Sequence, residues 1–433
     1  MSTAKEIKKQ IKILLICVLV GFLSGISAVI FRWLVHFFDK VMWIELSKLL
    51  SFLGKLNYLF IPMLGLATVN YLVKNTLTKK NLGHGVTEVI KIIRIKDGKI
   101  PYFVAPVEAL ASSLCIGSGG SVGPEGPMVQ IGAGVGSAVG QLFKLKNENL
   151  KIAAAAGAAG GLAAIFNAPI AGILFAMEAI VKSFNGNIFL YFVLSSITST
   201  QIYRKLWGNT HLLNIPNAIW GGWQELFIFL LLGIFGGFLG VVFIRFVNKA
   251  ENSFRNGEYK LFLNPIAGGF LLGIFALFIP QVLSEGYETI ESVLKNQFKT
   301  DVLIVLLAAK VAATSITLGS GGSGGLFAPS LVLGSLLGGM FSHLAGVFFP
   351  NIIGSHETYI AAGIAAVLAG VFNAPLTAVI MVIELSNNYN IALPLMTASV
   401  SASYICCLKF KGCSVYDLDL AKEEIKRKEN KFF

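Results

Sequence analysis

Long apolar runs alternate with short polar segments along the chain of 433 residues. A helix that crosses a bilayer needs about 20 mostly apolar residues. Four runs approach or exceed that length and predict spanning helices over 13–31, 226–246, 261–283 and 331–349. Shorter runs, such as 59–72 and 102–114, predict tilted, paired or re-entrant pieces. The pattern predicts an all-α integral membrane protein built from spanning and broken helices.

Composition and charge narrow the class further. With 55% hydrophobic and 13% charged residues, the chain has too little polar surface for a soluble protein of this size. The net charge of +12 would suggest nucleic acid in a soluble protein, but the basic residues gather at the two ends and in loops, including a cluster within 79–99. Cytoplasmic loops carry an excess of Lys and Arg, so both termini are expected in the cytoplasm of a multi-pass protein of the cell membrane.

Three sequence matches recur in the same order at a spacing of about 200 residues, which indicates an internal repeat. The pairs of matching segments are 21–31 with 233–243, 117–121 with 319–323, and Phe-Asn-Ala-Pro at 166–169 with the same residues at 372–375. Glu178 and Glu384 follow the last pair and suggest a shared structural role. The chain is therefore predicted to hold two transmembrane repeats of inverted topology, 1–217 and 218–416, followed by a charged cytoplasmic tail, 417–433.

Glu125 is the conspicuous charge in a glycine-rich break, residues 117–127, between apolar segments at 102–116 and 128–143. Pro127 suits the first turn of a new helix. A helix start offers free N–H groups and a positive dipole end, which together attract anions. A carboxylate at mid-membrane depth costs about 2.5–3.5 kcal/mol, whereas each N–H bond to a charged acceptor returns about 1.5–3 kcal/mol.

Glu125 and a mobile anion would then compete for one site, and protonation would release the side chain and open the path. The same residue would serve as gate and as proton acceptor. The alternative is that Glu125 only caps a helix or pairs with a basic side chain.

These motifs resemble those of the CLC family of chloride channels and chloride/proton exchangers over nearly the whole chain. Residues 123–127 are similar to the family's G-x-E-G-P with its gating glutamate, and 325–329 to its G-x-F-x-P. The resemblance implies that His84, Gly123, Gly126, Leu326, Phe327 and Tyr416 bind the anion. It also implies structural roles for Gly83, Gly85, Gly117, Ser118, Pro127, Glu178, Gly325 and Pro329, and a homodimer with one pore in each subunit.

Three positions depart from the family pattern. His84 stands where the family has a serine that contacts the ion, and its imidazole could either donate to the anion or turn away into packing. Pro124 has no N–H, which should weaken the outermost anion position. Ala179 stands where many exchangers carry a second, cytoplasm-facing proton glutamate, and this substitution leaves proton coupling open.

The favoured function is chloride transport by exchange for protons. The alternative is passive conduction by a voltage- or pH-gated chloride channel, and a fluoride exporter or a cation-coupled solute symporter is less favoured. An enzyme is not expected, because the motif serines lack a histidine or acidic partner placed to activate them. The expected partners are chloride, protons and the lipid bilayer, with no cofactor, metal, nucleic acid or nucleotide-binding module.

Overall fold

The computed structural model describes residues 2–77, 85–209, 213, 215, 218–256, 263–410 and 414–417. These residues form helices and no β-strand apart from one isolated bridge. The first half contains α1 (Ser2–Asp39), η1 (Lys40–Leu46), α2 (Ser47–Leu49), η2 (Ser51–Leu56), α3 (Asn57–Thr76), α4 (Gly85–Arg94), α5 (Val104–Gly117), α6 (Glu125–Leu142), α7 (Glu148–Phe166), α8 (Pro169–Phe175), η4 (Ala176–Val181) and α9 (Gly186–Trp207).

The second half repeats this sequence of long and short helices. It contains η5 (Trp223–Glu225), α10 (Leu226–Asn256), α11 (Leu263–Phe278), η6 (Pro280–Val282), α12 (Tyr287–Leu294), α13 (Thr300–Gly319), α14 (Phe327–Phe348), α15 (His356–Phe372), α16 (Pro375–Ser386) and α17 (Ala392–Phe410). In the described ranges, seven helical stretches are long and apolar enough to cross a membrane, and five apolar helices are shorter. The protein is an all-α integral membrane protein, as its hydrophobic pattern predicts.

Two of the expected element lengths are wrong. The predicted span over 261–283 is the 16-residue helix α11, which ends at Phe278 because Pro280 starts a separate 3-10 turn. The run 59–72, expected to be too short to cross, belongs to a 26-residue apolar stretch, Ser51–Thr76. The helix α3 begins at Asn57, whose side-chain N–H group donates to the Ser47 hydroxyl at 2.8 Å.

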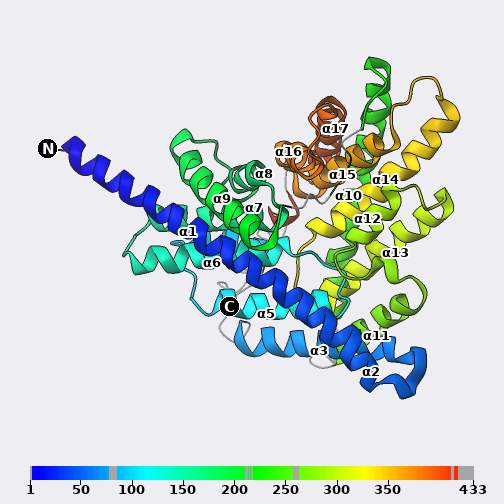
Figure 1. Cartoon of the computed structure of the whole chain (residues 1–433), viewed down its shortest axis with the longest axis horizontal. Coiled ribbons are helices and arrows are strands. Elements are labelled where there is room, and N and C mark those ends of the chain that lie inside the picture. Colours follow the sequence, from blue (N-terminus) through cyan, green and yellow to red (C-terminus); the bar gives the residue numbers. More distant parts are fainter. Residues whose placement is uncertain are drawn as a thin grey trace, which may run out of the picture.

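Helix packing repeats between the halves. α1 packs against α9 and α6 against α7, while α10 packs against α17 and α14 against α15. In Figure 1, α6 to α9 lie on the left, and α10, α13 and α14 lie on the right. Close approach depends on glycine at equivalent places: a Cβ added to Gly157 would lie 2.0 Å from the Gly132 carbonyl oxygen, and one added to Gly363 would lie 2.3 Å from that of Gly334.

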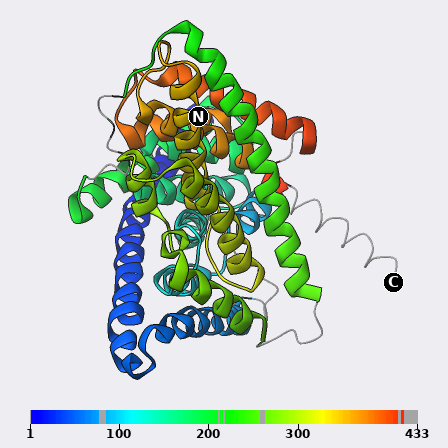
Figure 2. The same cartoon turned by 90° about the vertical axis from the view of Figure 1, so that its right-hand side faces the viewer.

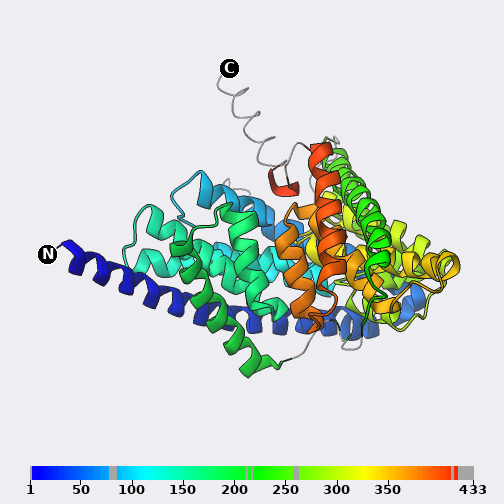
Figure 3. The same cartoon turned by 90° about the horizontal axis from the view of Figure 1, so that it is seen from above.

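Two long helices, α1 and α10, flank the body, and a pair of helices, α3 and α11, joins the halves. Figure 2 shows α1 and α10 on opposite sides, and Figure 3 shows α1 running along one edge from the N-terminus. α3 of the first half packs against α11 of the second, and the two lie together in Figure 1. The halves are therefore in contact at their periphery as well as at their centre.

The repeated Phe-Asn-Ala-Pro motifs build two matching helix breaks. Asn167 ends α7 and Asn373 ends α15, both in the left-handed conformation that asparagine tolerates at a helix C-terminus. Pro169 and Pro375 then begin α8 and α16, where a missing N–H costs nothing. The motif therefore turns the chain sharply and exposes a new helix N-terminus in each half.

Candidate functional site

The two glycine-rich breaks meet at the centre of the molecule. The N–H of Gly123 donates to the carbonyl of Gly325 at 2.9 Å, and the N–H of Gly325 donates to the carbonyl of Gly123 at 2.8 Å. The bridge is antiparallel, so the two loops run in opposite directions where they touch. Since α6 and α14 begin directly after these loops, their N-termini lie beside one another.

Glu125 is the first residue of α6 and is 2% exposed. Its Oε1 accepts a hydrogen bond from the backbone N–H of Phe327, the first residue of α14. Its Oε2 has no hydrogen-bond partner among the described residues. The carboxyl group of one half thus lies at the helix start of the other half, where free N–H groups and the helix dipole favour negative charge.

Glycines on both loops make room for this carboxyl group. A Cβ added to Gly123 would lie 2.1 Å from Glu125 Oε2, and one added to Gly325 would lie 2.1 Å from Oε1. Any larger residue would meet the carboxyl group at these positions. Pro127 and Pro329 are each the third residue of their helix, within the first turn.

An aromatic column extends from the Phe327 ring. Phe166 and Phe372, the motif phenylalanines of the two halves, have ring centroids 5.0 and 5.3 Å from that of Phe327. Phe372 in turn stacks on Tyr416 with centroids 5.5 Å apart, and Phe175 meets Tyr416 edge-on at 6.4 Å. Tyr416 is therefore held at the far end of a continuous ring stack that begins beside Glu125.

Asp417 fixes the short segment that carries Tyr416. Its carboxylate pairs with Arg94 at 3.2 Å and Lys182 at 2.6 Å, and it accepts the Ser414 hydroxyl at 2.7 Å. Burial raises the pKa of Asp417, but its bonds to Lys182 and Ser414 outweigh burial and lower the pKa below its usual value. Arg94 also donates to the carbonyl oxygens of Ala179 and Ile180. In the sequence, the basic cluster that holds Arg94 indicated topology alone, although Asp417, directly after Tyr416, offers it a charged partner.

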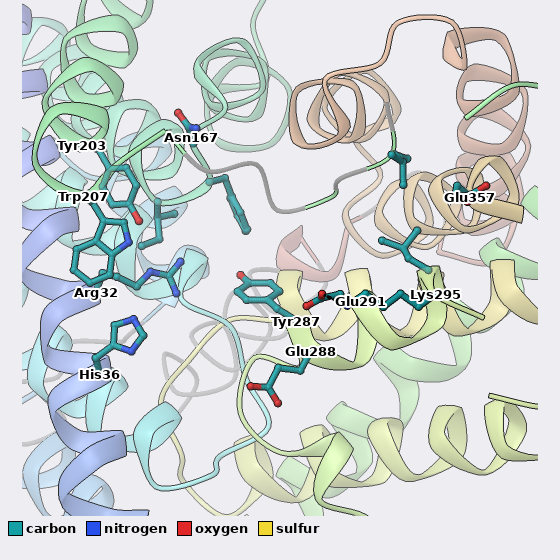
Figure 4. Close-up of a pocket in the computed structure, with 14 residues that line it drawn as sticks. Arg32, His36, Asn167, Tyr203, Trp207, Tyr287, Glu288, Glu291, Lys295 and Glu357 are labelled. Atoms are coloured by element: carbon teal, nitrogen blue, oxygen red, sulfur yellow. Dashed lines mark hydrogen bonds and ion pairs between the residues drawn. The ribbon is translucent and has the colours of Figure 1, made fainter. Parts of the chain in front are cut away.

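A cavity of about 840 Å³ opens beside Phe166 and Asn167. Arg32 lines it, and Figure 4 shows Arg32 and Tyr287 pointing toward one another across it. Arg32 pairs with Glu285 at 3.0 Å, and the two side chains are 15% and 11% exposed. Glu285 and Tyr287 are close enough to Glu125 to interact with it electrostatically. Arg32 was missed in sequence, because a single cation inside a long apolar run gives no hint of a partner so distant in the chain.

The remaining motif glycines and Ser118 lie around this centre. Gly117 packs against the end of α1, and Gly126 packs against the backbone of Gly325. Ser118 is the residue that follows α5, and its hydroxyl donates to the Cys115 carbonyl in the last turn of that helix at 3.1 Å. Leu326 is the residue that precedes α14, next to the N–H that Glu125 uses.

Gly85 is the first residue of α4, and its N–H donates to the side-chain carbonyl of Gln130 on α6. Gly83 and His84 lie outside the described residues, so their proposed roles stay predictions.

Glu178 and Glu384 form a reciprocal pair of caps. Glu178 accepts from the N–H groups of Leu376 and Thr377 at 3.2 and 2.8 Å, at the start of α16. Glu384 accepts from the N–H groups of Ile170 and Ala171 at 3.0 and 2.7 Å, at the start of α8. Each half therefore supplies the carboxylate that satisfies the other half's helix N-terminus.

Within the described ranges, no group of three or more His, Cys, Asp or Glu side chains is placed to hold a metal ion. At the centre, the start of α14 offers a backbone N–H that suits an anion, and the titratable group that contacts it is the carboxyl group of Glu125.

Comparisons with known proteins agree with this geometry. Residues 64–407 match the family model described as voltage gated chloride channel. The chain is 31% identical over 407 residues to the H(+)/Cl(-) exchange transporter ClcA of Vibrio cholerae, covering 91% of this chain and 86% of the relative. It is 31% identical over 420 residues to ClcA of Vibrio vulnificus, covering 94% and 88%.

Solved structures lead to the same fold. A slow cyanobacterial Cl-/H+ antiporter superposes with a TM-score of 0.87 at 26% identity, covering 96% of this chain and 99% of that one. A CLC-type fluoride/proton antiporter superposes with a TM-score of 0.77 at 21% identity, covering 94% and 96%, which supports the fold alone. The chain belongs to the voltage gated chloride channel family, the CLC family.

Proposed function

We propose that the protein exchanges chloride for protons across the bilayer, with Glu125 as the gate. One observation carries the proposal: the carboxyl group of Glu125 occupies the first N–H of α14, a place that suits any small anion. The ClcA relatives and the cyanobacterial neighbour are named as exchangers of these two ions. Passive chloride conduction has no observation that favours it over exchange.

Chloride and the carboxylate compete for the same donors. Ionised Glu125 holds the Phe327 N–H, and a bond of this kind to a charged acceptor contributes about 1.5–3 kcal/mol. Protonation removes the charge and weakens that bond, so the side chain can leave and chloride can take its place. Backbone groups at Gly126, Leu326 and Phe327 would then surround the ion together with Gly123, although the N–H of Gly123 donates to Gly325 and Pro124 offers no N–H.

The path by which chloride enters and leaves is proposed from the cavity and the aromatic column near Glu125. The cavity lined by Arg32 is also lined by Phe166, at one end of the aromatic column, and Tyr416 lies at the other end. Arg32 attracts chloride into the cavity, although its pairing with Glu285 limits how tightly an anion can be held there. Tyr416 is proposed to donate its hydroxyl to the ion further along the path.

Paired flux measurements test the proposal. Purified protein in liposomes should drive protons uphill when a chloride gradient is imposed, and Glu125→Gln should pass chloride without moving protons. Chloride flux without any proton movement in the wild type would instead identify a passive channel. Parallel efflux of fluoride and chloride separates a fluoride exporter from a chloride transporter.

Other parts of the proposal concern assembly and placement. A homodimer with one pore in each subunit, both termini in the cytoplasm, and residence in the cell membrane are proposed from the family and from the distribution of basic residues. His84 is retained as a proposed anion contact.

A further inference from the structure

A second carboxyl group is buried near the centre. Glu108 lies in α5 and is 0% exposed. Its Oε1 accepts hydrogen bonds from the hydroxyl groups of Ser112 and Ser323, each at 3.1 Å, and these two hydroxyls are 2.8 Å apart. Its Oε2 has no hydrogen-bond partner among the described residues. A fully buried carboxyl oxygen left in this way calls for a reason beyond packing.

Ser323 connects Glu108 to the proposed gate. It lies on the loop between α13 and α14, two residues before the Gly325 that bridges to Gly123 and contacts the Glu125 carboxyl group. The hydroxyl cluster around Glu108 is therefore part of the same pair of loops that holds Glu125. Ser323 contacts Glu108 directly, and Gly325, two residues later on the same loop, contacts Glu125.

The contacts of α5 and α6 show on which side of Glu125, along the direction of α6, Glu108 lies. α6 runs from Glu125 to its end near Phe143, whose carbonyl accepts from Lys12 at 3.5 Å, on the side assigned to the cytoplasm. α5 runs the opposite way: Ala105 lies against Gly134 in the middle of α6, and Gly117 lies against the far end of α1.

Glu108 therefore lies on the Lys12 side of Glu125, displaced by roughly one to two helical turns, or about 5–10 Å. A proton that enters from that side meets Glu108 before it meets Glu125.

Glu108 forms no ion pair with any of the described residues, and its hydrogen-bond donors are the neutral hydroxyls of Ser112 and Ser323. The Cys115 thiol on the same helix is close enough to Glu108 to interact with it electrostatically. In the other half, the equivalent position is Lys310, but its ammonium donates to the carbonyls of Val282 and Ser284.

Helices α1, α3 and α6 pack on α5, and their nearer charges are engaged or distant. Arg32 is paired with Glu285, Glu125 is bonded to Phe327, Asp39 lies beside the far end of α5 at Gly117, and Lys74 lies in the last turn of α3. A buried carboxylate without a cation is costly, and binding a proton removes that cost.

We propose that Glu108 is the second proton-carrying carboxyl group of the transporter, exchanging protons between Glu125 and the Lys12 side of the membrane. The inference rests on the proposed chloride/proton exchange. In the step, an O–H bond breaks at one carboxyl group and another forms at the other, and the Ser112 and Ser323 hydroxyls accept and donate along the way. Only a proton moves, so no oxidant or reductant is needed.

The test compares proton and chloride flux in proteoliposomes for the wild type, Glu108→Gln and Glu108→Asp. Glu108→Gln keeps an oxygen for the two serines but cannot carry a proton, so the proton-to-chloride ratio should fall by at least about tenfold while chloride flux stays within about threefold. Glu108→Asp keeps a carboxyl group and should retain coupled proton movement. Glu148→Gln is the matched control, because Glu148 is an exposed carboxylate whose side chain is 78% exposed.

Each outcome decides between defined alternatives. A wild-type ratio in Glu108→Gln overturns the role of Glu108 while the proposed exchange stands. A wild type that moves no protons overturns both the role of Glu108 and the proposed chloride/proton exchange. If Glu108→Gln does not fold, Ser323→Ala replaces it: this variant keeps the carboxyl group and removes one hydroxyl, so the ratio should fall several-fold, and an unchanged ratio refutes the relay.

Discussion

Replacing Gly123 by alanine should displace the Glu125 carboxyl group without changing any charge. The three atoms nearest to a Cβ at this position all belong to that carboxyl group: Oε2 at 2.1 Å, with Cδ and Oε1 both at 2.7 Å. The backbone of Gly123 does not have a positive φ, so alanine is conformationally acceptable. The side chain of Glu125 is the flexible partner and is expected to move.

The size of the effect follows from the bond that is lost. Displacement breaks the hydrogen bond from the Phe327 N–H to Glu125 Oε1. A bond to a charged acceptor is worth about 1.5–3 kcal/mol, and about 1.4 kcal/mol corresponds to a factor of ten. The ratio of closed to open gate should therefore fall by roughly 10- to 150-fold.

Chloride efflux from proteoliposomes at neutral pH measures this change. Gly123→Ala should raise the flux by about tenfold or more, up to the point where passage through the pathway itself becomes limiting. Flux should also depend less on pH, because protonation of Glu125 is no longer needed to free the site. Gly346→Ala is the matched control on α14, since a Cβ there has its nearest atom at an ordinary 3.7 Å.

A double-mutant comparison shows whether the added methyl group acts through Glu125. In a Glu125→Ala background no carboxyl group remains to be displaced, so Gly123→Ala should have no further effect. If Gly123→Ala instead lowers chloride flux equally in both backgrounds, the substitution acts by disturbing the Gly123–Gly325 bridge. The inference that the added methyl group acts by displacing the Glu125 carboxyl group would then be wrong.

Two further predictions concern the scaffold around the site. Glu178→Ala and Glu384→Ala should each lower the free energy of unfolding by about 1–3 kcal/mol, because each leaves helix N–H groups of the other half without an acceptor. Thermal unfolding in detergent measures this loss, which should be similar for the two variants. Glu148→Ala is the exposed control. Asp417→Asn should speed hydrogen exchange across 414–417 at neutral pH. Burial raises the pKa of Asp417, but the bonds to Lys182 and Ser414 lower it more strongly. The stabilisation by the Asp417 carboxylate is therefore present above the usual pKa of 3.8 and is lost as the pH falls through the lowered pKa. The wild type and Asp417→Asn should accordingly exchange at the same rate in acid.

The central loops were the most predictable part of the structure. Glycine and proline in 117–127 predicted a helix break followed by a new helix, and α6 does begin at Glu125. The repeated motif predicted an equivalent break in the second half, and α14 begins at Phe327. These features are local, since they depend on backbone freedom and on a missing N–H, and local features can be recognised in sequence.

Contacts between distant charges could not be predicted in this way. The Arg32–Glu285 pair joins residues separated by more than half of the chain, and the Arg94–Asp417 pair by still more. Only the packing of the helices brings these partners together. Glu108 was overlooked for another reason: the segment 102–116 was interpreted as apolar throughout, although the repeat aligns Glu108 with Lys310 and so marks a charged position in both halves.

A comparison of the two halves distinguishes residues that build the fold from residues proposed to carry protons. The residues that both halves share build the fold. Asn167 and Asn373 end equivalent helices, Glu178 caps the start of α16, and Glu384 caps the start of α8. Where the halves differ at equivalent positions, one half keeps an acidic group that its counterpart lacks: Glu125 opposite Phe327, and Glu108 opposite Lys310. A symmetric scaffold can hold an anion at the meeting point of its helix N-termini, but a symmetric pair of carboxylates there would repel each other and the anion. The two carboxyl groups proposed to carry protons, Glu108 and Glu125, both come from the first half, whereas the buried Glu285 of the second half is paired with Arg32.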